Sequence, residues 1–259
     1  MINNIDIKLI IGIARNAGDA ILGIYQQDFE VITKADNSPL TLADSQSNDI
    51  ILEGLKKHYP DIPFISEETK ADSYEERKNW PYFWLIDPLD GTKEFIKKNG
   101  EFTVNIALMH ENKPVLGVVH VPAQNTTYYG VKGEGSFKID EQGNTISLNG
   151  GHTHYSDKKH VVVIASRSHL SDAVKEFVEE LKSTGKEVEF LSAGSSLKLC
   201  LVAENKADVY PRFGPTMEWD TGAAHAVAEM AGRSVLRADE RTPLEYNKEN
   251  LLNPWFIVE

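Results

Sequence analysis

Apolar residues in the first 58 positions recur at the three- and four-residue spacing of amphipathic helices. This spacing predicts one helix over 5–27 and a second from 41 to about 58. From residue 64 the pattern changes to short apolar or alternating runs, which predict strands at 64–69, 83–86, 102–109, 114–121, 126–131 and 135–139. The close succession of the last four predicts a largely antiparallel sheet. A charged segment over 70–79 has few apolar residues and is expected to be mobile.

Residues 161–258 follow a different pattern, in which apolar strands alternate with helices. The run from Val161 to Ala165 is continuously apolar, which is typical of a strand buried on both faces. Further strands are expected at 187–191, 207–210 and 255–258, and helices at 170–183, 195–203 and 221–231. This alternation predicts an α/β half with mostly parallel strands. We therefore expect an N-terminal α+β domain over 1–152 and a C-terminal α/β domain over 153–259.

The composition, with 41% hydrophobic and 25% charged residues among 259, is that of an ordinary water-soluble protein. A net charge of −12 argues against a nucleic-acid polymer as partner, since such binding relies on clustered Lys and Arg. No stretch approaches the roughly 20 apolar residues of a transmembrane segment, and the N-terminus lacks the features of a signal peptide. A cytoplasmic location is expected, with peripheral association at the cytoplasmic face of the inner membrane left open. Monomer and homodimer are both left open.

The segment Trp84-Leu85-Ile86-Asp87-Pro88-Leu89-Asp90-Gly91-Thr92 carries the first candidate chemistry. Its apolar start predicts a buried strand that stops before the proline, which cannot continue a strand. Asp87 and Asp90, separated by one stiff turn, can face a common point, and their oxygens favour a hard divalent ion such as Mg²⁺. Gly91 and Thr92 open a short helical stretch whose N–H groups suit a phosphate. Asp-Pro and Asp-Gly are also ordinary turn dipeptides, so the segment alone leaves both interpretations open.

Three further carboxylates stand at the ends of predicted elements. Asp44 lies in a capping-box-like helix start, Glu67 ends a short strand, and Asp220 precedes an Ala-rich helix. Each has a structural explanation as a cap or a solvated turn, which for Asp44 is favoured on the local sequence alone. Ends of elements are also where α/β folds build their sites, so the five carboxylates together indicate one shared site.

Four motifs, in this order, carry a family resemblance: Leu40-Thr41-Leu42-Ala43-Asp44, Ser66-Glu67-Glu68, Asp87-Pro88-Leu89-Asp90-Gly91-Thr92 and Trp219-Asp220. Together they resemble the inositol monophosphatase superfamily of lithium-sensitive, Mg²⁺-dependent phosphomonoesterases, across essentially the whole chain. The resemblance implies an α+β or α/β fold, a layered αβαβα sandwich, with a site for two or three Mg²⁺ ions.

The same resemblance implies a role for each matched residue. The implied metal ligands are Glu67, Asp87, the carbonyl oxygen of Leu89, Asp90 and Asp220. Thr92 and Asp44 match the pair that orients and deprotonates the attacking water, with Glu67 as the third catalytic residue. Gly91 and Thr92 match the phosphate cradle.

Several stretches most resemble the bacterial 3′(2′),5′-bisphosphate nucleotidase branch of this family. They are 90–95, 100–108, 194–198 and 210–220. Arg212 stands where the inositol branch carries an acidic residue, and a guanidinium there favours a substrate with a second phosphate. Ser195, Ser196 and Lys198 are further donors implied for that phosphate, and Asp220 is also implied at the substrate. Lys198 and Arg212 can also be interpreted as solvated surface charges.

The implied activity is removal of the 3′-phosphate from 3′-phosphoadenosine 5′-phosphate to give AMP and phosphate, a reaction of sulfur metabolism. The corresponding 5′-phosphosulfate is a second implied substrate. Arg167 and His169 are candidates to line the adenine pocket. Two alternatives stay open. An inositol or sugar monophosphatase is disfavoured by Arg212, and a non-catalytic binding protein that needs a divalent cation is disfavoured by the Asp44 and Thr92 pair.

Overall fold

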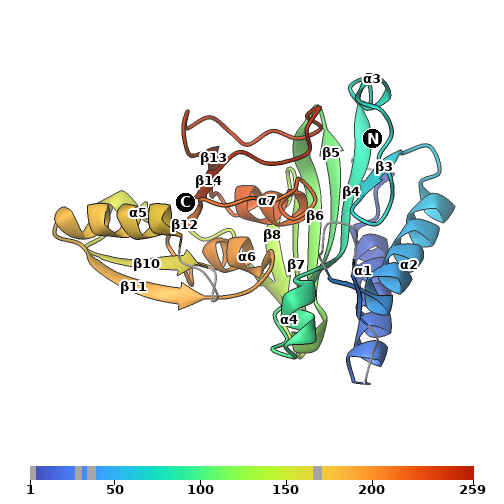
Figure 1. Cartoon of the computed structure of the whole chain (residues 1–259), viewed down its shortest axis with the longest axis horizontal. Coiled ribbons are helices and arrows are strands. Elements are labelled where there is room, and N and C mark those ends of the chain that lie inside the picture. Colours follow the sequence, from blue (N-terminus) through green and yellow to red (C-terminus); the bar gives the residue numbers. More distant parts are fainter. Residues whose placement is uncertain (1–3, 27–30, 34–38, 166–170) are drawn as a thin grey trace.

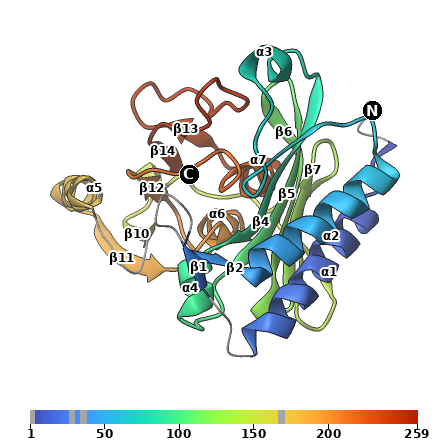
Figure 2. The same ribbon diagram turned by 45° about the vertical axis from the view of Figure 1, so that its right-hand side comes forward.

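The helices and sheets of the chain lie in five layers (Figure 1), in a computed structural model that describes residues 4–26, 31–33, 39–165 and 171–259. Helices α1 (Ile7–Tyr25) and α2 (Leu42–His58) lie side by side against one face of a seven-stranded sheet (Figure 2). Helix α7 (Gly222–Met230), with α6 (Leu197–Ala203) packed beside it, covers the opposite face. A smaller sheet and then α5 (Asp172–Ser183) follow. The layered αβαβα sandwich expected from the sequence is confirmed.

The seven strands of the large sheet lie in the order in which they occur along the chain. They are β3 (Phe64–Ser66), β4 (Tyr82–Asp90), β5 (Thr103–His110), β6 (Lys113–Val121), β7 (Thr126–Val131), β8 (Gly135–Ile139) and β9 (Thr145–Ser147). β3 and β4 are parallel, and each later pair is antiparallel, which confirms the largely antiparallel sheet. The sequence does not predict β9, because its residues are all exposed and form no apolar run.

Strand β4 continues to Asp90, so the prediction that it stops before Pro88 is wrong. Its pairing with β5 shifts register between Asp87 and Asp90, and this β-bulge accommodates a proline that has no N–H to donate. The Pro88 carbonyl accepts a hydrogen bond from the Ser47 hydroxyl of α2 at 2.7 Å. Bulges of this kind redirect the neighbouring side chains, here the two aspartates.

The smaller sheet combines parallel and antiparallel pairs. β10 (His160–Ala165) and β11 (Glu187–Ser192) are parallel, and a parallel bridge between Val163 and Val209 joins β10 to the chain entering β12 (Tyr210–Arg212). β14 (Phe256–Val258) pairs antiparallel with both β12 and β13 (Val235–Arg237). The expectation of mostly parallel strands is therefore wrong for this part of the sheet. β14 follows a loop, whereas parallel strands are usually joined by a crossover helix.

Two glycines let α7 approach the large sheet closely. A Cβ added at Gly117 of β6 would lie 2.1 Å from the carbonyl oxygen of Ala223, and one at Gly130 of β7 would lie 2.7 Å from that of Ala226. The helix presents alanines at this contact, so little side-chain volume separates its backbone from the sheet. Because Asp220 precedes α7 by two residues, this contact sets the position of Asp220 over the sheet.

The charged segment 70–79 contains a short helix, α3 (Tyr74–Arg77), which Ser73 and Glu76 cap reciprocally. Arg77 is only 3% exposed. A buried guanidinium in this segment is at odds with the expectation of a mobile, solvated loop. The other short elements are α4 (Thr92–Ile96), the antiparallel pair β1 (Val31–Thr33) and β2 (Pro39–Thr41), and the 3₁₀ turns η2 (Pro122–Gln124) and η3 (Tyr155–Asp157).

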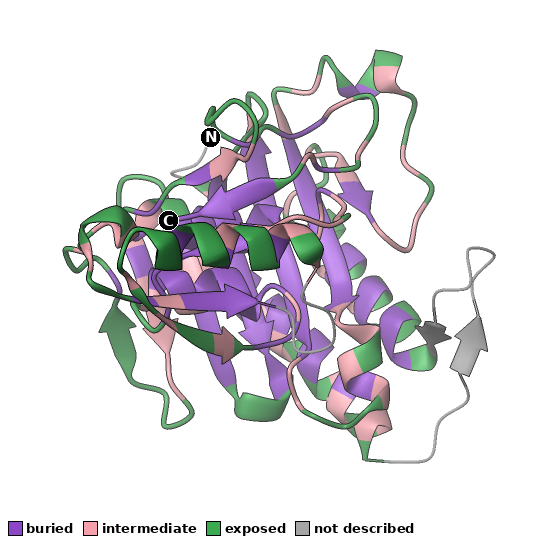
Figure 3. Cartoon of the chain, turned by 60° about the vertical axis from the view of Figure 1, so that its left-hand side comes forward, coloured by how far each residue is buried: buried purple, intermediate pink, exposed green. Residues whose placement is uncertain are grey.

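The strands of the large sheet are mostly buried, whereas α5 exposes its outer face (Figure 3). The largest core cluster includes residues from both sides of position 152, among them Leu85 and Val227. A domain boundary at 152/153 stays a prediction. Within the described ranges, no helix combines the length and the apolar content needed to cross a bilayer.

Candidate metal centre and active site

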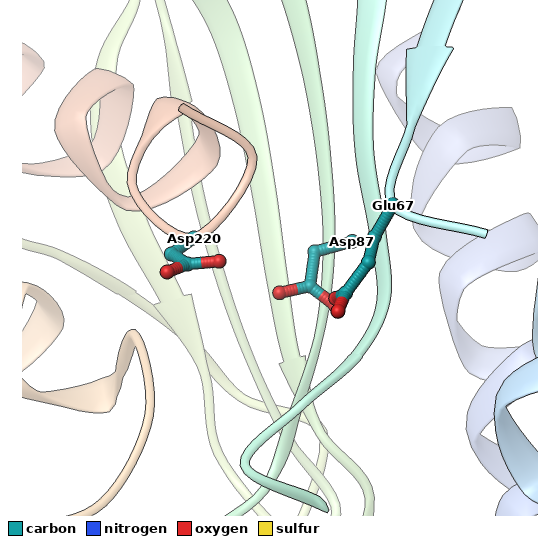
Figure 4. Close-up of side chains that lie close together, drawn as sticks. All are labelled: Glu67, Asp87 and Asp220. Atoms are coloured by element: carbon teal, nitrogen blue, oxygen red, sulfur yellow. The ribbon is translucent and has the colours of Figure 1, made fainter. Parts of the chain in front are cut away.

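Three carboxylates from three separate elements meet beside the ends of β3 and β4. One carboxylate oxygen from each of Glu67, Asp87 and Asp220 lies within 4.8 Å of the other two. Figure 4 shows Asp220 reaching toward the other two side chains from the turn before α7, while Glu67 follows β3 and Asp87 projects from β4. The folded chain therefore concentrates negative charge from distant parts of the sequence.

Asp87 is held on the sheet with no exposed surface. Its Oδ1 accepts a hydrogen bond from the backbone N–H of Leu89 at 3.1 Å. Its Oδ2 is buried and has no hydrogen-bond partner among the described residues. A buried carboxylate oxygen without a donor costs free energy unless another group binds it.

A tight turn presents Asp220 to the other two carboxylates. The backbone N–H of Met217 donates to its Oδ2 at 2.9 Å, and the Ser196 hydroxyl donates to its carbonyl oxygen. The N-cap residue of α7 is Thr221 and not Asp220. The explanation of Asp220 as a simple helix cap is therefore wrong, and its carboxylate lies where it interacts with Asp87.

Burial and mutual repulsion raise the pKa values of three aspartates in and beside this cluster. Burial, together with repulsion from the neighbouring carboxylates, raises the pKa of Asp87 well above its ordinary range. Burial, followed by repulsion from Asp90, raises the pKa of Asp220 to about 8. Burial also raises the pKa of Asp90 to about 6, although Lys198 opposes this rise. So many buried carboxylates cannot all ionise at neutral pH without nearby positive charge.

The cluster fits a hard divalent cation. Its donors are all oxygens, the ligand type that Mg²⁺ and Ca²⁺ prefer over nitrogen or sulfur. Asp87 supplies a buried acceptor oxygen with no hydrogen-bond donor among the described residues. A cation here would bind that oxygen and offset the burial and repulsion that raise the pKa values of Asp87 and Asp220.

Two of the residues predicted as ligands stand apart from the three-carboxylate cluster. Asp90 directs Oδ2 to Ser196, whose backbone N–H donates to it at 2.6 Å and whose hydroxyl oxygen lies 3.1 Å away. Leu89 is buried in β4, and a ligand role for its carbonyl oxygen stays a prediction. Ser196 thus contacts both Asp90 and Asp220 and links the two sides of the site.

Asp44 and Thr92 come from the starts of two helices. Asp44 lies in the first turn of α2 and is 2% exposed, and its charge contributes to the raised pKa of Asp87. Thr92 begins α4 directly after Gly91, whose φ of 91° lies in the left-handed region that favours glycine. The burial of Asp44 among like charges is more than a solvated helix cap requires. The pairing of Asp44 with Thr92 in proton transfer stays a prediction.

A cavity of about 170 Å³ adjoins the carboxylates and also exposes cationic and hydroxyl groups. The residues predicted for the substrate that line it are Gly91, Ser195, Ser196, Lys198, Arg212 and Asp220. The Ser195 hydroxyl oxygen is buried without a hydrogen-bond partner among the described residues. The cavity therefore presents acids and donors to one small volume.

Both cations of the cavity are more than surface charges. Lys198 is 7% exposed, its Nζ donates to the Ser195 carbonyl at 2.8 Å, and burial lowers its pKa to about 8. Arg212 donates from Nη2 to the Pro215 carbonyl at 2.8 Å, and its Nε is buried without a hydrogen-bond partner in the described part of the chain. The surface-charge interpretation is wrong for Lys198, and a buried Nε disfavours it for Arg212.

The sequence alone did not reveal the role of Asn105. This residue lies opposite Asp87 in the β4–β5 ladder and is 1% exposed. Its Nδ2 donates to the Ser196 hydroxyl at 3.2 Å, while its Oδ1 has no hydrogen-bond partner among the described residues. The sequence signal for its importance is a polar side chain within the largely apolar run 102–109. Arg167 and His169, the adenine-pocket candidates, lie outside the described residues.

The chain is similar to proteins of known sequence and structure over nearly its whole length. A 3′(2′),5′-bisphosphate nucleotidase CysQ of Escherichia coli (strain K12) is 47% identical over 249 residues, which cover 95% of this chain and 96% of that protein. A protein of the same description from Haemophilus influenzae is 38% identical over 250 residues, with coverage of 95% and 89%.

The crystal structure of CysQ from Bacteroides thetaiotaomicron has a TM-score of 0.85 and 46% identity, covering 97% of this chain and 96% of that one. The IMPase of Thermotoga maritima, at 22% identity, shares the fold with a TM-score of 0.72 over 96% of this chain and 89% of that one. Residues 5–255 match the sequence model of the inositol monophosphatase family. With the acidic cluster and the layered fold, these findings show that the chain belongs to the inositol monophosphatase family, a family of metal-dependent phosphatases.

Proposed function

We propose that this protein is a Mg²⁺-dependent phosphomonoesterase that removes the 3′-phosphate of 3′-phosphoadenosine 5′-phosphate, giving AMP and phosphate. The observation that carries the proposal is the cavity that Lys198 and Arg212 line together with Asp90 and Asp220. A site for a single phosphate on an uncharged alcohol has no need of two buried or half-buried cations beyond its metal ligands. A second anionic group on the substrate gives those cations a partner.

The acidic residues are assigned to the metal. Glu67, Asp87, Asp90, Asp220 and the carbonyl of Leu89 would hold two or three Mg²⁺ ions. Bound Mg²⁺ neutralises phosphate charge and acidifies water, which are the two tasks that carboxylates alone cannot perform. Burial and the repulsion between carboxylates, which raise the pKa values of Asp87, Asp90 and Asp220, support this assignment.

The remaining residues act on the water and the phosphates. In the proposed reaction a water oxygen attacks phosphorus in line with the bond to the 3′-oxygen. That bond breaks, and AMP leaves as its 3′-oxygen takes up a proton from solvent. The Thr92 hydroxyl orients that water and passes its proton to Asp44, and the backbone N–H groups of Gly91 and Thr92 bind the phosphate oxygens. Lys198, Arg212 and the hydroxyls of Ser195 and Ser196 bind the 5′-phosphate.

The proposed division of the chain follows the same roles. Residues 1–152 supply every assigned carboxylate except Asp220. Residues 153–259 supply Asp220 and all the donors assigned to the second phosphate. On this view the N-terminal part binds metal and the C-terminal part selects the substrate.

The first test compares phosphate release from 3′-phosphoadenosine 5′-phosphate and from inositol 1-phosphate, each with Mg²⁺ and with EDTA. We expect Mg²⁺-dependent release from the nucleotide and little from the inositol phosphate. Faster release from inositol 1-phosphate would overturn the substrate assignment and leave the metal site standing. Absence of release from either would favour a non-catalytic binding protein. The rate of phosphate release from 3′-phosphoadenosine 5′-phosphosulfate in the same assay shows which of the two nucleotides is the better substrate.

A further inference from the structure

A buried arginine outside the active site links the segment after the predicted ligand Glu67 to the C-terminal loop. Arg77 is 3% exposed, and in the described chain its guanidinium donates only to neutral oxygens. The Nε bonds to the Asp72 carbonyl at 2.9 Å, and Nη2 bonds to the Lys248 and Glu249 carbonyls at 3.3 and 3.4 Å. One side chain therefore holds the segment that follows Glu67 against the C-terminal loop.

Asn247 makes the central contact with this arginine. Arg77 Nη1 donates to Asn247 Oδ1 at 2.7 Å, and Asn247 Nδ2 donates back to the Arg77 carbonyl at 2.7 Å. Asn247 is 3% exposed and its φ of 59° is left-handed, so the surrounding structure fixes it in an uncommon conformation. Such a reciprocal pair tolerates little change in the distance between its two segments.

Glu218 carries the link on to the metal ligand Asp220. Its carboxylate, with no exposed surface, accepts the backbone N–H of Asn247 at 2.6 Å and Lys248 Nζ at 2.5 Å. The carbonyl of the same residue accepts the N–H groups of Thr221 and Gly222 at 3.2 and 3.0 Å. Glu218 therefore fixes the turn that presents Asp220.

We infer that Arg77, through Asn247 and Glu218, is a positioning residue that sets the spacing between Glu67 and Asp220. This inference rests on the proposed metal site, because it concerns two of its ligands. Only arginine offers donors in the three directions that this junction uses, toward the segment after Glu67, toward Asn247 and toward the backbone after it. Loss of a group hydrogen-bonded directly to a metal ligand typically changes metal affinity by about 10–100-fold. Arg77 acts through two further residues, so we expect an effect at the lower end of this range.

Arg233 provides a matched control at the other end of α7. It is 5% exposed, and its guanidinium also donates to the side-chain carbonyl of an asparagine, Asn205. It touches neither a carboxylate of the site nor the turn before α7. Loss of either arginine leaves a cavity and unpartnered acceptors, so both should lower the melting temperature.

The experiment measures binding of Mn²⁺ alone to the full-length protein, stripped of metal, by the loss of the free-ion electron paramagnetic resonance signal. We expect Arg77→Met to weaken Mn²⁺ binding by about tenfold at a temperature well below its melting point. Arg233→Met should also lower the melting temperature and change the Mn²⁺ affinity by less than about twofold. Asn247→Ala, which leaves three of the Arg77 hydrogen bonds in place, should weaken Mn²⁺ binding by about threefold.

Unchanged Mn²⁺ affinity in Arg77→Met and Asn247→Ala would overturn the positioning role. Equal weakening in Arg233→Met would also overturn it, because the effect would then follow from lost stability alone. If Arg77→Met does not fold, Asn247→Ala decides the question. Failure of the wild-type protein to bind Mn²⁺ would instead overturn the metal site, and this inference with it.

Discussion

The two parts of the candidate site differ in charge and in mechanical support. Asp44, Glu67, Asp87 and Asp90 all come from the first 90 residues, on or beside the large sheet. The hydroxyl and cationic groups assigned to the second phosphate come from residues 195–212, on loops, on α6 and at the end of β12. Only Asp220 crosses this division, and the contact of α7 with Gly117 and Gly130 holds it over the sheet.

This difference teaches how one fold can keep its chemistry and change its substrate. A strand that is buried from Phe83 to Leu89 holds Asp87, so the metal site has little freedom to rearrange. Arg212 lies at the end of a three-residue strand and is half-buried, so its replacement disturbs few neighbours. We therefore expect changes on the acidic side to abolish catalysis, and changes on the cationic side to alter selectivity.

The largest expected effect is that of Asp87→Asn on the acidic side. The amide removes a ligand oxygen, so kcat should fall by at least about 1,000-fold, or about 4 kcal/mol of transition-state stabilisation. The same change removes repulsion, so the melting temperature in EDTA should stay level or rise. Steady-state phosphate release and thermal unfolding measure the two effects. Asp239→Asn, at an exposed carboxylate, is the control, and a loss of activity in both variants would contradict the assignment.

Replacing the guanidinium on the cationic side should have the next largest effect. Arg212→Glu is expected to lower kcat/KM for 3′-phosphoadenosine 5′-phosphate by about 100-fold, because a carboxylate repels the 5′-phosphate. Activity on 3′-AMP, which lacks that phosphate, should change much less, and Mn²⁺ affinity should not fall, because the change places an anion near Asp220. Arg212→Lys keeps the charge and serves as the control. A similar loss on both nucleotides would show that Arg212 does not select the second phosphate.

The contact that joins the two parts can be loosened at Gly117. A methyl group there would lie 2.1 Å from the Ala223 carbonyl oxygen, so Gly117→Ala should destabilise the protein by about 2 kcal/mol. The displaced helix should also weaken Mn²⁺ binding through Asp220. Gly12→Ala in α1, where nothing lies within 4 Å of the added Cβ, should instead stabilise by about 0.5–1 kcal/mol. Denaturant unfolding measures both changes. Equal free energies of unfolding in Gly117→Ala and Gly12→Ala would contradict the close contact.

The smallest expected effect is a pH dependence of the metal-free protein. The pKa values of Asp90, about 6, and Asp220, about 8, lie above the value of about 4 for an unfolded carboxyl. The folded state thus binds more protons between pH 4 and 8, and its stability falls as pH rises through that window. We expect the melting temperature in EDTA to drop by about 3 °C or more from pH 5 to 8. Saturating Mg²⁺ should reduce this slope, and Asp220→Asn should flatten it; a slope unchanged by both would contradict the shifts.

The layered fold and the acidic cluster were predictable because both depend on patterns that the local sequence carries. Helical spacing in 7–25 and alternation in 103–139 place the elements to within a few residues of their observed ends. Glu67 follows β3, Asp87 lies near the end of β4 and Asp220 precedes α7. Their meeting followed from the arrangement of these elements. The family resemblance added the pairing of motifs that lie far apart in the sequence.

What the sequence did not show are features decided by tertiary contacts. Pro88 normally ends a strand, but a bulge and the Ser47 hydroxyl let β4 continue past it. Arg77 belongs to a charged segment whose composition predicts exposure to solvent. It is buried because its guanidinium hydrogen-bonds Asn247, which lies 170 positions away in the sequence. The antiparallel pairing of β14 likewise depends on where the C-terminal loop returns, which no local pattern encodes.

The sequence positions of Glu67, Asp87 and Asp220 also have a kinetic consequence. The cluster closes only when α7 docks on a sheet made of residues that left the ribosome much earlier, so it depends on contacts of very long sequence separation. A cation therefore has no complete set of ligands during the early steps of folding and cannot act as their nucleus. In a refolding experiment, the return of Mn²⁺ affinity should mark the arrival of the last helix, after the sheet has formed.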